Sequence, residues 1–427
     1  MSCRVSRSWL VVLPGCVGRL SRVVEVGTGS EGAIMIAKHT IRRNLNLDVL
    51  RIVAMLLIVA CHATLHIPWL LNIDTVPLQY LPGWKSALAF LVVQYGQVGV
   101  SIFFMISGYF LVRKDFQVRR VFSTWFQMFC YSVLSFALIL VARHRSLTLP
   151  DKVTELLQGE QLPHTIVTVL FPFLSNSYWF VTAYIVMLLV SPFLNCLFEH
   201  LSQRSIGCLM LLLGFLATWK LFNVSTPVWT NFTYAILGYV TGGWIRVYGR
   251  TMRMPAKPLL LTAIIAASTV VMTVFNHHAA ERTTFTTFFA WETKIKPGIE
   301  VLPIVIAAAI VLLALEVDLS WIRGFPRALI LRAAASTFGI YLIHENMFWY
   351  RIIWPTITGM MPTPDTFFDK LIVGAEIVLI IFIAAGAVSF VLDTLLVHPI
   401  SRMMIAIVDT ADRPRRGHEP IRHARRK

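Results

Sequence analysis

From about residue 49 to residue 398 the chain alternates long blocks of apolar residues with short polar stretches. Many of the blocks approach the roughly 20 residues that an α-helix needs to cross about 30 Å of hydrocarbon. Because backbone polar groups inside a bilayer must bond within the protein, the pattern predicts an all-α, polytopic membrane helix bundle of about ten transmembrane helices. The predicted helices cover residues 49–67, 88–112, 120–142, 178–198, 206–222, 228–247, 258–276, 299–316, 336–354 and 371–398. A shorter apolar piece at 165–174 is rich in Pro and Phe, which favours a re-entrant or interfacial segment.

Basic residues gather in alternate loops of this predicted bundle. The loops that share one side contain Arg113, Lys114, Arg119, Arg120, Arg204, Arg246, Arg250, Arg253, Lys257, Arg323, Arg327 and Arg332. The opposite loops have fewer basic residues and mix them with acids. Because positively charged loops stay in the cytoplasm, the asymmetry predicts that both termini are cytoplasmic. The longer loops at 143–177 and 277–298 then face outward and are candidates for holding a large extracytoplasmic molecule.

The composition agrees with one membrane domain. Of the 427 residues, 56% are hydrophobic and only 14% are charged, too few to cover a water-facing surface. The net charge of +16 raises the possibility of nucleic-acid binding, but cytoplasmic loops and a basic tail against anionic lipid explain it better. We therefore expect a bilayer partner and no nucleic acid.

Three regions follow from this reading. Residues 35–405 form the transmembrane domain, and residues 406–427 form a basic cytoplasmic tail. Residues 1–34 make a poor signal peptide, so we expect them to be disordered or an overextended reading frame. The six cysteines form no CxxC pair and lie mostly in apolar stretches, which indicates neither a disulfide framework nor a metal site.

The first predicted helix has a polar stripe. Arg51 and His62 are eleven positions apart. At about 100° and 1.5 Å per residue, they return to within about 20° of one face and are about 16 Å apart along the axis. Asp48 and His66 flank the same stripe. Ionisable groups in a span usually face the bundle interior or a wet cavity, and they mark function.

Each of these side chains also has a structural interpretation. Arg51 alone is equally typical of an arginine that snorkels to the cytoplasmic rim, and His62 alone is typical of a bond to a neighbouring helix. Their alignment favours function. A guanidinium at the cytoplasmic end of the helix can bind phosphates, and coenzyme A is rich in phosphates. The long arm that carries its thioester is about as long as the distance from Arg51 to His62. An imidazole, whose unperturbed pKa is about 6.5, is suited to take a proton from an attacking hydroxyl.

Other polar and aromatic residues also have both a functional and a structural interpretation. Glu345 is a candidate to orient His62 and to stabilise its imidazolium, as a carboxylate does in a hydrolase triad. The alternatives are that Glu345 pairs with His344 or Arg351, or faces external water. Trp179 fits an interfacial aromatic belt better than a sugar-stacking site, although both remain open. Cys61 is a poor nucleophile for His62 because adjacent helix residues point about 100° apart.

Several segments together resemble the acyltransferase 3 family. The segment 48–51 followed by His62 resembles the family's opening helix, whose signature is an arginine, ten residues and a histidine. Residues 99–109 resemble its second-helix motif, residues 178–180 through 191–192 its aromatic-to-proline helix, and residues 336–344 its late helix. The resemblance runs from about residue 44 to residue 400. The family often has two arginines in an Arg-x-x-Arg spacing entering its third helix, whereas here Arg119 and Arg120 are adjacent.

The resemblance implies a ten-helix fold that O-acetylates sugars of surface glycans with acetyl-CoA or another short acyl-CoA as co-substrate. It also implies that Arg51 and His62 are essential. We expect His62 to be catalytic and Arg51 to bind the acyl donor, with Arg119 and Arg120 as further donor-binding candidates. We add Glu345 as a catalytic residue, and Trp179 and His344 as acceptor-binding residues, and we expect no metal. The enzyme would lie in the cell membrane, and a bacterial cytoplasmic membrane fits best.

Two mechanisms and one rival function remain. His62 acts either as a general base or as a transient acyl carrier. The rival is a transporter or flippase of a lipid-linked saccharide, because buried His, Arg and Glu also serve proton-coupled transport. That class often has two related halves with broken helices, and no such pairing is visible in this chain.

Overall fold

The computed structural model describes residues 44–67, 69, 83–174, 178–218, 231–249, 256–280, 301–361 and 363–411. Within these residues the chain is helical and contains no β-strand, as the apolar blocks predict. The predictions for residues 1–34, for the end of the basic tail and for most of the 277–298 loop lie outside the described residues.

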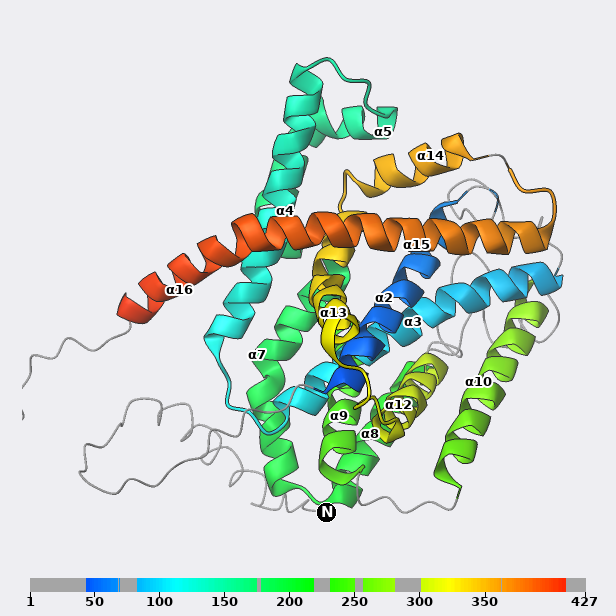
Figure 1. The fold of residues 1–427 in the computed structure, drawn as a ribbon. Helices are drawn as coiled ribbons and strands as arrows, with labels where there is room; N and C mark the ends of the chain where they lie inside the picture. Colours follow the sequence, from blue (N-terminus) through cyan, green and yellow to red (C-terminus); the bar gives the residue numbers. More distant parts are fainter. Residues whose placement is uncertain are drawn as a thin grey trace, which may run out of the picture. The chain divides into compact units, whose positions relative to one another are not determined.

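The helices follow one another along the chain, with short 3-10 and π segments marked η (Figure 1). Their bounds are α2 Leu45–His66, α3 Gly83–Leu111, α4 Val118–His144, α5 Asp151–Thr154, η4 Glu155–Leu157, α6 Gln161–Leu170, η5 Pro172–Leu174, α7 Trp179–His200, α8 Gln203–Thr218, α9 Asn231–Tyr248, α10 Lys257–Ala280, α12 Val301–Glu316, α13 Gly324–His344, α14 Tyr350–Met360, α15 Phe367–Leu392, η8 Asp393–Val397 and α16 His398–Ala411.

Six helical segments among the described residues are long and apolar enough to cross a bilayer. They are Leu45–His66, Ala87–Leu111, Val118–His144, Trp179–His200, Lys257–His278 and Phe367–Ile405. The apolar helices Gln203–Thr218 and Val301–Glu316 are shorter. The chain is therefore a multi-pass membrane protein, whereas a total of about ten spans and the cytoplasmic termini stay predictions from hydropathy and charge.

The late helix differs most from its prediction. The sequence predicts a single helix over 336–354, but α13 begins at Gly324 and ends at His344, and α14 begins only at Tyr350. The physical reason lies in Asn346, whose side-chain oxygen accepts the backbone N–H of Phe348 at 3.0 Å. Such a local bond competes with the helical ladder. His344 and Glu345 therefore lie at the end of a helix rather than near the middle of one.

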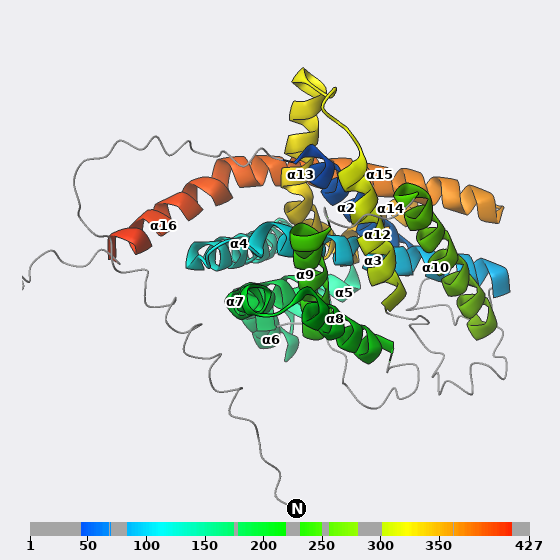
Figure 2. The same ribbon diagram turned by 90° about the horizontal axis from the view of Figure 1, so that it is seen from below.

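The last predicted helix, 371–398, is also longer than expected. Helix α15 begins at Phe367 because Thr366 and Asp369 form a capping box, with the Asp369 N–H donating to Thr366 Oγ1 at 3.1 Å. The π-helical turn η8 joins it to α16. Figures 1 and 2 both show α15 and α16 following each other as one extended rod with a bend between them. The predicted re-entrant piece at 165–174 forms the end of α6 and the short turn η5.

The chain divides into two compact units. Unit 1 comprises residues 1–58, 77–116 and 186–331. Unit 2 comprises residues 59–76, 117–185 and 332–427. The boundary between the units runs through α2, α7 and α13, so each of these helices has residues in both units.

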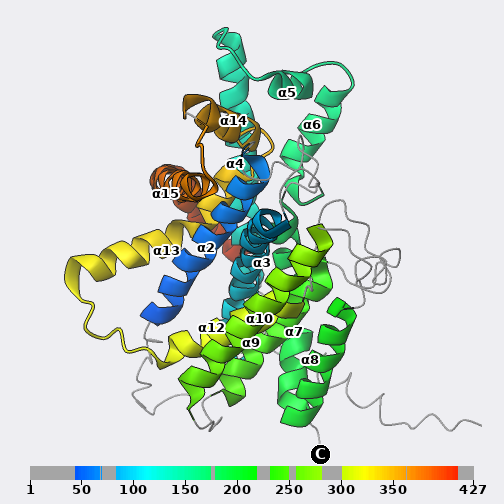
Figure 3. The same ribbon diagram turned by 90° about the vertical axis from the view of Figure 1, so that its right-hand side faces the viewer.

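Unit 1 is built around α3, which packs against α9, α10 and α12. Figure 3 shows α9, α10 and α12 running in similar directions. Helix α12 packs against α10 and α9, and α8 packs against α9. The close approach of α3 and α9 depends on glycine, because a methyl group at Gly108 would collide with the backbone carbonyl of Tyr239, and one at Gly242 with that of Met105. Small residues let membrane helices approach in this way.

Unit 2 contains a hairpin of α4, α5, η4 and α6, whose apolar side chains pack on the segment that follows Glu345. Ile139 of α4, Val153 of α5 and Val169 of α6 share a buried core with Met347 and Phe348. This hairpin therefore holds the break between α13 and α14 in place.

A second polar group in unit 2 is buried between α4 and α15. The Asp393 carboxyl accepts Gln127 Nε2 at 2.9 Å, the Tyr131 hydroxyl at 3.0 Å and the Ser389 hydroxyl at 3.2 Å. Beside it, a methyl group at Gly339 would collide with the side chains of Ser389 and Tyr131. We call Asp393, Gln127, Tyr131 and Ser389 the Asp393 cluster.

Candidate functional site

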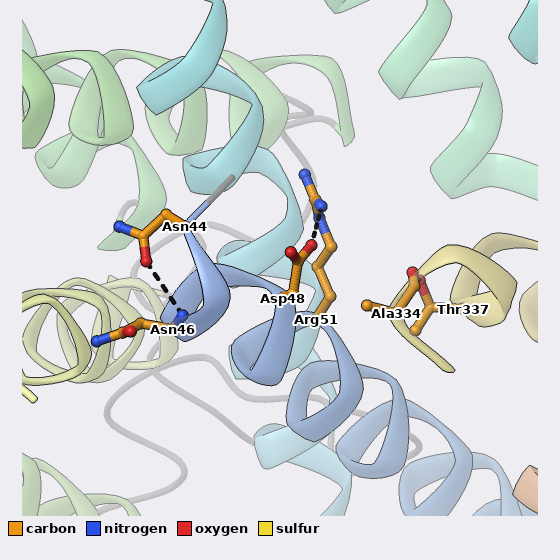
Figure 4. Close-up of polar contacts among 6 residues, drawn as sticks. All are labelled: Asn44, Asn46, Asp48, Arg51, Ala334 and Thr337. Carbon is orange, nitrogen blue, oxygen red and sulfur yellow. Dashed lines mark hydrogen bonds and ion pairs between the residues drawn. The ribbon is translucent and has the colours of Figure 1, made fainter. Parts of the chain in front are cut away.

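The first turns of α2 place an arginine beside a buried carboxylate. Asn44 precedes the helix, and its side-chain oxygen accepts the Asn46 N–H at 3.0 Å, as an N-cap residue does. One turn further on, Arg51 Nη1 donates to Asp48 Oδ1 at 2.7 Å (Figure 4). The Asp48 side chain is 1% exposed and the Arg51 side chain 29%. Asp48 therefore orients a guanidinium that stays open to solvent.

The same guanidinium lies against an aromatic ring of unit 1. Its carbon atom Cζ is 5.6 Å from the ring centre of Phe110 at the end of α3. This contact and Asp48 fix Arg51 from two sides. An arginine has five N–H donors, so a single bond to Asp48 leaves donors for an anionic ligand.

Arg246 repeats this arrangement at the end of α9. Its Cζ lies 5.0 Å from the ring centre of Tyr109, and its Nη1 donates to the Tyr109 hydroxyl at 3.3 Å. Arg51 and Arg246 thus contact successive aromatic residues of α3. The sequence shows Arg246 only as one basic residue of a cytoplasmic loop, and the aromatic pair at 109–110 is the signal that would have singled it out.

The end of α2 brings a histidine to the break after α13. His62 Nδ1 lies 3.0 Å from His344 Nε2 and 3.2 Å from Glu345 Oε1. His344 is fully buried, whereas the side chains of His62 and Glu345 are 15% and 17% exposed. We call these three residues the histidine cluster. All three belong to unit 2, and the Glu345–His62 approach expected from the sequence is present, while their chemical roles stay predictions.

The contacts of His344 determine which nitrogen of His62 carries the hydrogen. His344 Nδ1 lies 2.6 Å from the Ile340 carbonyl, which only accepts, so this nitrogen carries the hydrogen. In the neutral ring, His344 Nε2 is then an acceptor. The contact to His62 needs one hydrogen, so His62 Nδ1 must donate it. The lone pair of His62 therefore lies on Nε2, the nitrogen that points away from His344.

The turn that carries Glu345 is held by buried hydrogen bonds. Asn346 Nδ2 donates to the Tyr178 hydroxyl at 2.8 Å, and this hydroxyl donates to the Leu342 carbonyl at 2.9 Å. Tyr178 and Asn346 are both almost fully buried. Tyr178 directly precedes Trp179, and no feature of the sequence predicts its positioning role. The predicted acceptor contact of Trp179 stays a prediction.

Glu345 has a carboxylate oxygen that could accept a further hydrogen bond. Among the described residues, its buried Oε1 has no partner with hydrogen-bond geometry, although His62 Nδ1 is close to it. A buried polar atom without a hydrogen bond is rare and needs a functional or structural explanation. Here a carboxylate next to the hydrogen-bearing nitrogen of an imidazole is placed to stabilise positive charge on that ring.

Aromatic rings extend from His62 along the C-terminal end of α2. His66 stacks on His62 with ring centres 6.3 Å apart and on Trp354 with ring centres 5.9 Å apart. Tyr350 also contacts His66, at 5.5 Å between ring centres. Both partners lie on α14, so this short helix packs against His66, one helical turn after His62 on α2.

The other residues selected from the sequence lie elsewhere. Arg119 is exposed and Arg120 half-buried in the first turn of α4. Trp179 is the first residue of α7, and its ring packs edge-to-face against Phe180. His344 joins the histidine cluster, where both of its ring nitrogens have partners, and its predicted acceptor contact stays a prediction. Cys61 is half-buried beside His62.

Comparison with known families gives the activity class. A sequence profile described as an acyltransferase domain, that of the acyltransferase 3 family, matches residues 44–395. The chain belongs to the acyltransferase 3 family. No significant match exists among the curated proteins or the solved structures.

As a member of this family the chain is a membrane acyltransferase, and the transporter alternative is not favoured. The matched region begins one residue before α2 and ends within η8, so it contains both Arg51 and the histidine cluster. The resemblance drawn from the spaced motifs of the sequence is confirmed.

Proposed function

We propose that the protein is an O-acetyltransferase of the cell membrane, which moves an acyl group from cytoplasmic acetyl-CoA or another short acyl-CoA to a hydroxyl of an extracytoplasmic or lipid-linked glycan. The observation that carries the proposal is the histidine cluster. An imidazole with a lone pair on Nε2 and a carboxylate next to Nδ1 is the arrangement that general-base catalysis needs.

In the direct mechanism His62 Nε2 removes the proton of the acceptor hydroxyl. The hydroxyl oxygen attacks the thioester carbon of the donor, and the carbon–sulfur bond breaks as the new ester bond forms. The coenzyme A thiolate leaves and takes the proton from His62. Glu345 stabilises the imidazolium between these two proton transfers.

In the relay mechanism His62 Nε2 attacks the thioester itself and carries the acyl group to the acceptor. Both mechanisms use the same nitrogen, so the hydrogen-bond pattern around His62 serves either. Incubation with labelled acyl-CoA and no acceptor separates them. A trapped acyl-His62 supports the relay, and its absence in a single turnover supports direct transfer.

The donor end of the proposal rests on Arg51. Its guanidinium is half-exposed and already oriented by Asp48, which lowers the entropic cost of gripping a phosphate. His62 lies eleven positions further along α2, or about 16 Å along an ideal helix. We propose that Arg51 binds the phosphates of coenzyme A, with Arg119 and Arg120 as additional cations, and that the acceptor contacts Trp179.

The central experiment compares O-acyl groups on surface glycans, by mass spectrometry, in cells with the wild-type protein and with His62→Ala. We expect His62→Ala to lower the rate by roughly 10²–10⁴-fold, the usual contribution of a general base, so the O-acyl content should fall to background. His278→Ala, an exposed histidine at the end of α10, is the matched control and should leave it unchanged. Equal O-acyl content in wild type and His62→Ala would refute the enzyme proposal.

The donor assignment has its own test with purified protein. Arg51→Ala removes a charged hydrogen-bond donor, so the KM for acetyl-CoA should rise by about 10–100-fold while kcat changes less. Arg51→Lys keeps the charge without the bidentate geometry, so its KM should lie between those of the wild type and Arg51→Ala. Arg323→Lys, in the exposed loop before α13, is the control. An unchanged KM in Arg51→Ala would remove Arg51 from the donor site.

A further inference from the structure

The histidine cluster also has the composition of a metal site. Among the described residues, the ligand atoms of His62, His344 and Glu345 all lie within 4.8 Å of one another. We propose that these three side chains bind Zn²⁺, and that the bound cation switches His62 off by holding its imidazole in the wrong tautomer. Zinc binding stands without the proposed acyl transfer, whereas the inhibition rests on it.

The spacing of the ligand atoms fits a small tetrahedral cation. Zinc–nitrogen and zinc–oxygen bonds of about 2.0–2.2 Å place neighbouring ligand atoms of a tetrahedron about 3.3 Å apart. His62 Nδ1 is already 3.0 Å from His344 Nε2 and 3.2 Å from Glu345 Oε1. A shift of a few tenths of an ångström therefore brings these two pairs to the spacing of zinc ligands. The third pair, His344 Nε2 and Glu345 Oε1, lies within 4.8 Å and would close around the cation.

The chemistry of the ligands selects the metal. Two imidazole nitrogens and one carboxylate oxygen form a set typical of zinc with a fourth position for water. Magnesium and calcium prefer sites made of oxygen atoms alone. Glu345 Oε1 is buried and has no hydrogen-bond partner in the described structure, so a cation would supply the interaction that this atom lacks.

The surroundings of the ligands resemble an outer shell of a metal site. His344 donates its other ring hydrogen to the Ile340 carbonyl at 2.6 Å, which directs the lone pair of Nε2 into the cluster. A metal-binding histidine usually has such a partner. On the other side, the bond from Asn346 to Tyr178 fixes the turn that carries Glu345. Two of the three ligands are thus held before any cation binds.

The consequence for His62 follows from its two nitrogens. Without metal, the hydrogen of its neutral ring lies on Nδ1 and the lone pair on Nε2. A cation bound to Nδ1 requires that lone pair, so the hydrogen moves to Nε2. Nε2 then becomes a donor and has no lone pair with which to take a proton or an acyl group. No atom is oxidised or reduced, and removal of the cation restores the original tautomer.

The binding test uses full-length protein in lipid nanodiscs, with neither donor nor acceptor present. Equilibrium dialysis against Zn²⁺, read by elemental mass spectrometry, should find one high-affinity zinc per chain. His344→Gln and Glu345→Gln should each weaken binding by more than about tenfold, since loss of an outer-shell partner alone costs that much. The double variant His277→Gln/His278→Gln removes the stacked histidine pair of α10 and should bind zinc as the wild type does.

Two results would overturn the zinc site. One is zinc that stays bound with full affinity in both cluster variants, and the other is zinc that is lost in the α10 control alone. Because a cluster variant can fail to fold, wild-type protein is also loaded with Co²⁺. Tetrahedral cobalt gives intense visible absorption that Zn²⁺ displaces, and absence of this displaceable band also overturns the site.

The inhibition is tested on the same samples. Acyl transfer by the wild type should fall in proportion to bound zinc and return with a chelator, and the α10 control should respond in the same way. Zinc bound to the cluster with unchanged transfer would refute the tautomer lock. If the preparation transfers no acyl group even without zinc, the proposed function fails, while the dialysis and cobalt results still decide the metal site.

Discussion

The histidine cluster and the Asp393 cluster are both buried polar groups of unit 2, but they complete their hydrogen bonds to different degrees. In the Asp393 cluster both carboxyl oxygens accept bonds, from Gln127 and Tyr131 on one side and from Ser389 on the other. In the histidine cluster, Glu345 Oε1 has no hydrogen-bond partner among the described residues. The lone pair on His62 Nε2 is likewise left for another molecule.

This difference separates two uses of polar residues inside a membrane protein. A network whose members are all bonded links helices and stabilises one arrangement of them. A network with unused capacity costs stability, and it persists where the unused atoms meet a substrate or a reaction intermediate. On this reasoning the Asp393 cluster supports the fold, and the histidine cluster supports the chemistry. The substitutions below should therefore affect opposite properties.

The largest effect is expected for Glu345→Gln. The amide keeps an oxygen near His62 Nδ1 but cannot stabilise an imidazolium, so kcat should fall by roughly 10²-fold or more. The apparent Tm should stay the same or rise slightly, because a neutral amide is less costly to bury than a charge. Steady-state kinetics and thermal unfolding of one preparation measure both.

Glu345→Asp is the companion variant for this prediction. It keeps the charge and withdraws the carboxylate by one methylene, so it should recover part of the lost rate. Full activity in Glu345→Gln would show that the carboxylate takes no part in the reaction and would remove the contrast between the clusters.

The Asp393 cluster should give the reverse pattern with Tyr131→Phe. This change deletes one donor to Asp393 while Gln127 still serves the same oxygen. The stability should fall by about 1–2 kcal/mol, the upper range for a polar bond between membrane helices, and kcat per folded molecule should not change. A loss of kcat with normal stability would place Tyr131 in the chemistry and contradict the division.

The sequence predicts some of this organisation because hydropathy and helical periodicity are local. Apolar blocks mark α2, α4, α7, α10 and α15, and the spacing of Arg51 and His62 on one helix follows from 3.6 residues per turn. The family motifs likewise identify His62 and Arg51 without a structure. These features need no knowledge of which helices meet.

Side-chain hydrogen bonds, whether local or between distant segments, do not follow from hydropathy. The break after His344 depends on a side-chain bond from Asn346 to the backbone, which competes with a helix that hydropathy alone would continue. The role of Tyr178 depends on a partner 168 positions along the chain. Nothing in the local pattern separates Tyr178 from Trp179, and nothing predicts that His344 shares a hydrogen with His62. The boundary of α13 and the positioning residues therefore required the structure.

The smallest expected effect sharpens the comparison most, because it tests whether the Asp393 cluster behaves as a set of independent bonds. The Ser389 hydroxyl donates to Asp393 Oδ2 at 3.2 Å. Its oxygen also lies 3.2 Å from the Tyr131 hydroxyl, whose single hydrogen is shared between Asp393 Oδ1 and Ser389 Oγ. Ser389→Ala removes both long bonds and should cost about 0.5–1 kcal/mol of stability, with unchanged kcat. In the double variant with Tyr131→Phe, their shared bond is lost only once. The stability lost in the double variant should therefore be smaller than the sum of the two single losses, by a few tenths of a kcal/mol. Strict additivity in thermal unfolding would mean that the two hydroxyls do not interact, and that Asp393 alone holds the cluster together.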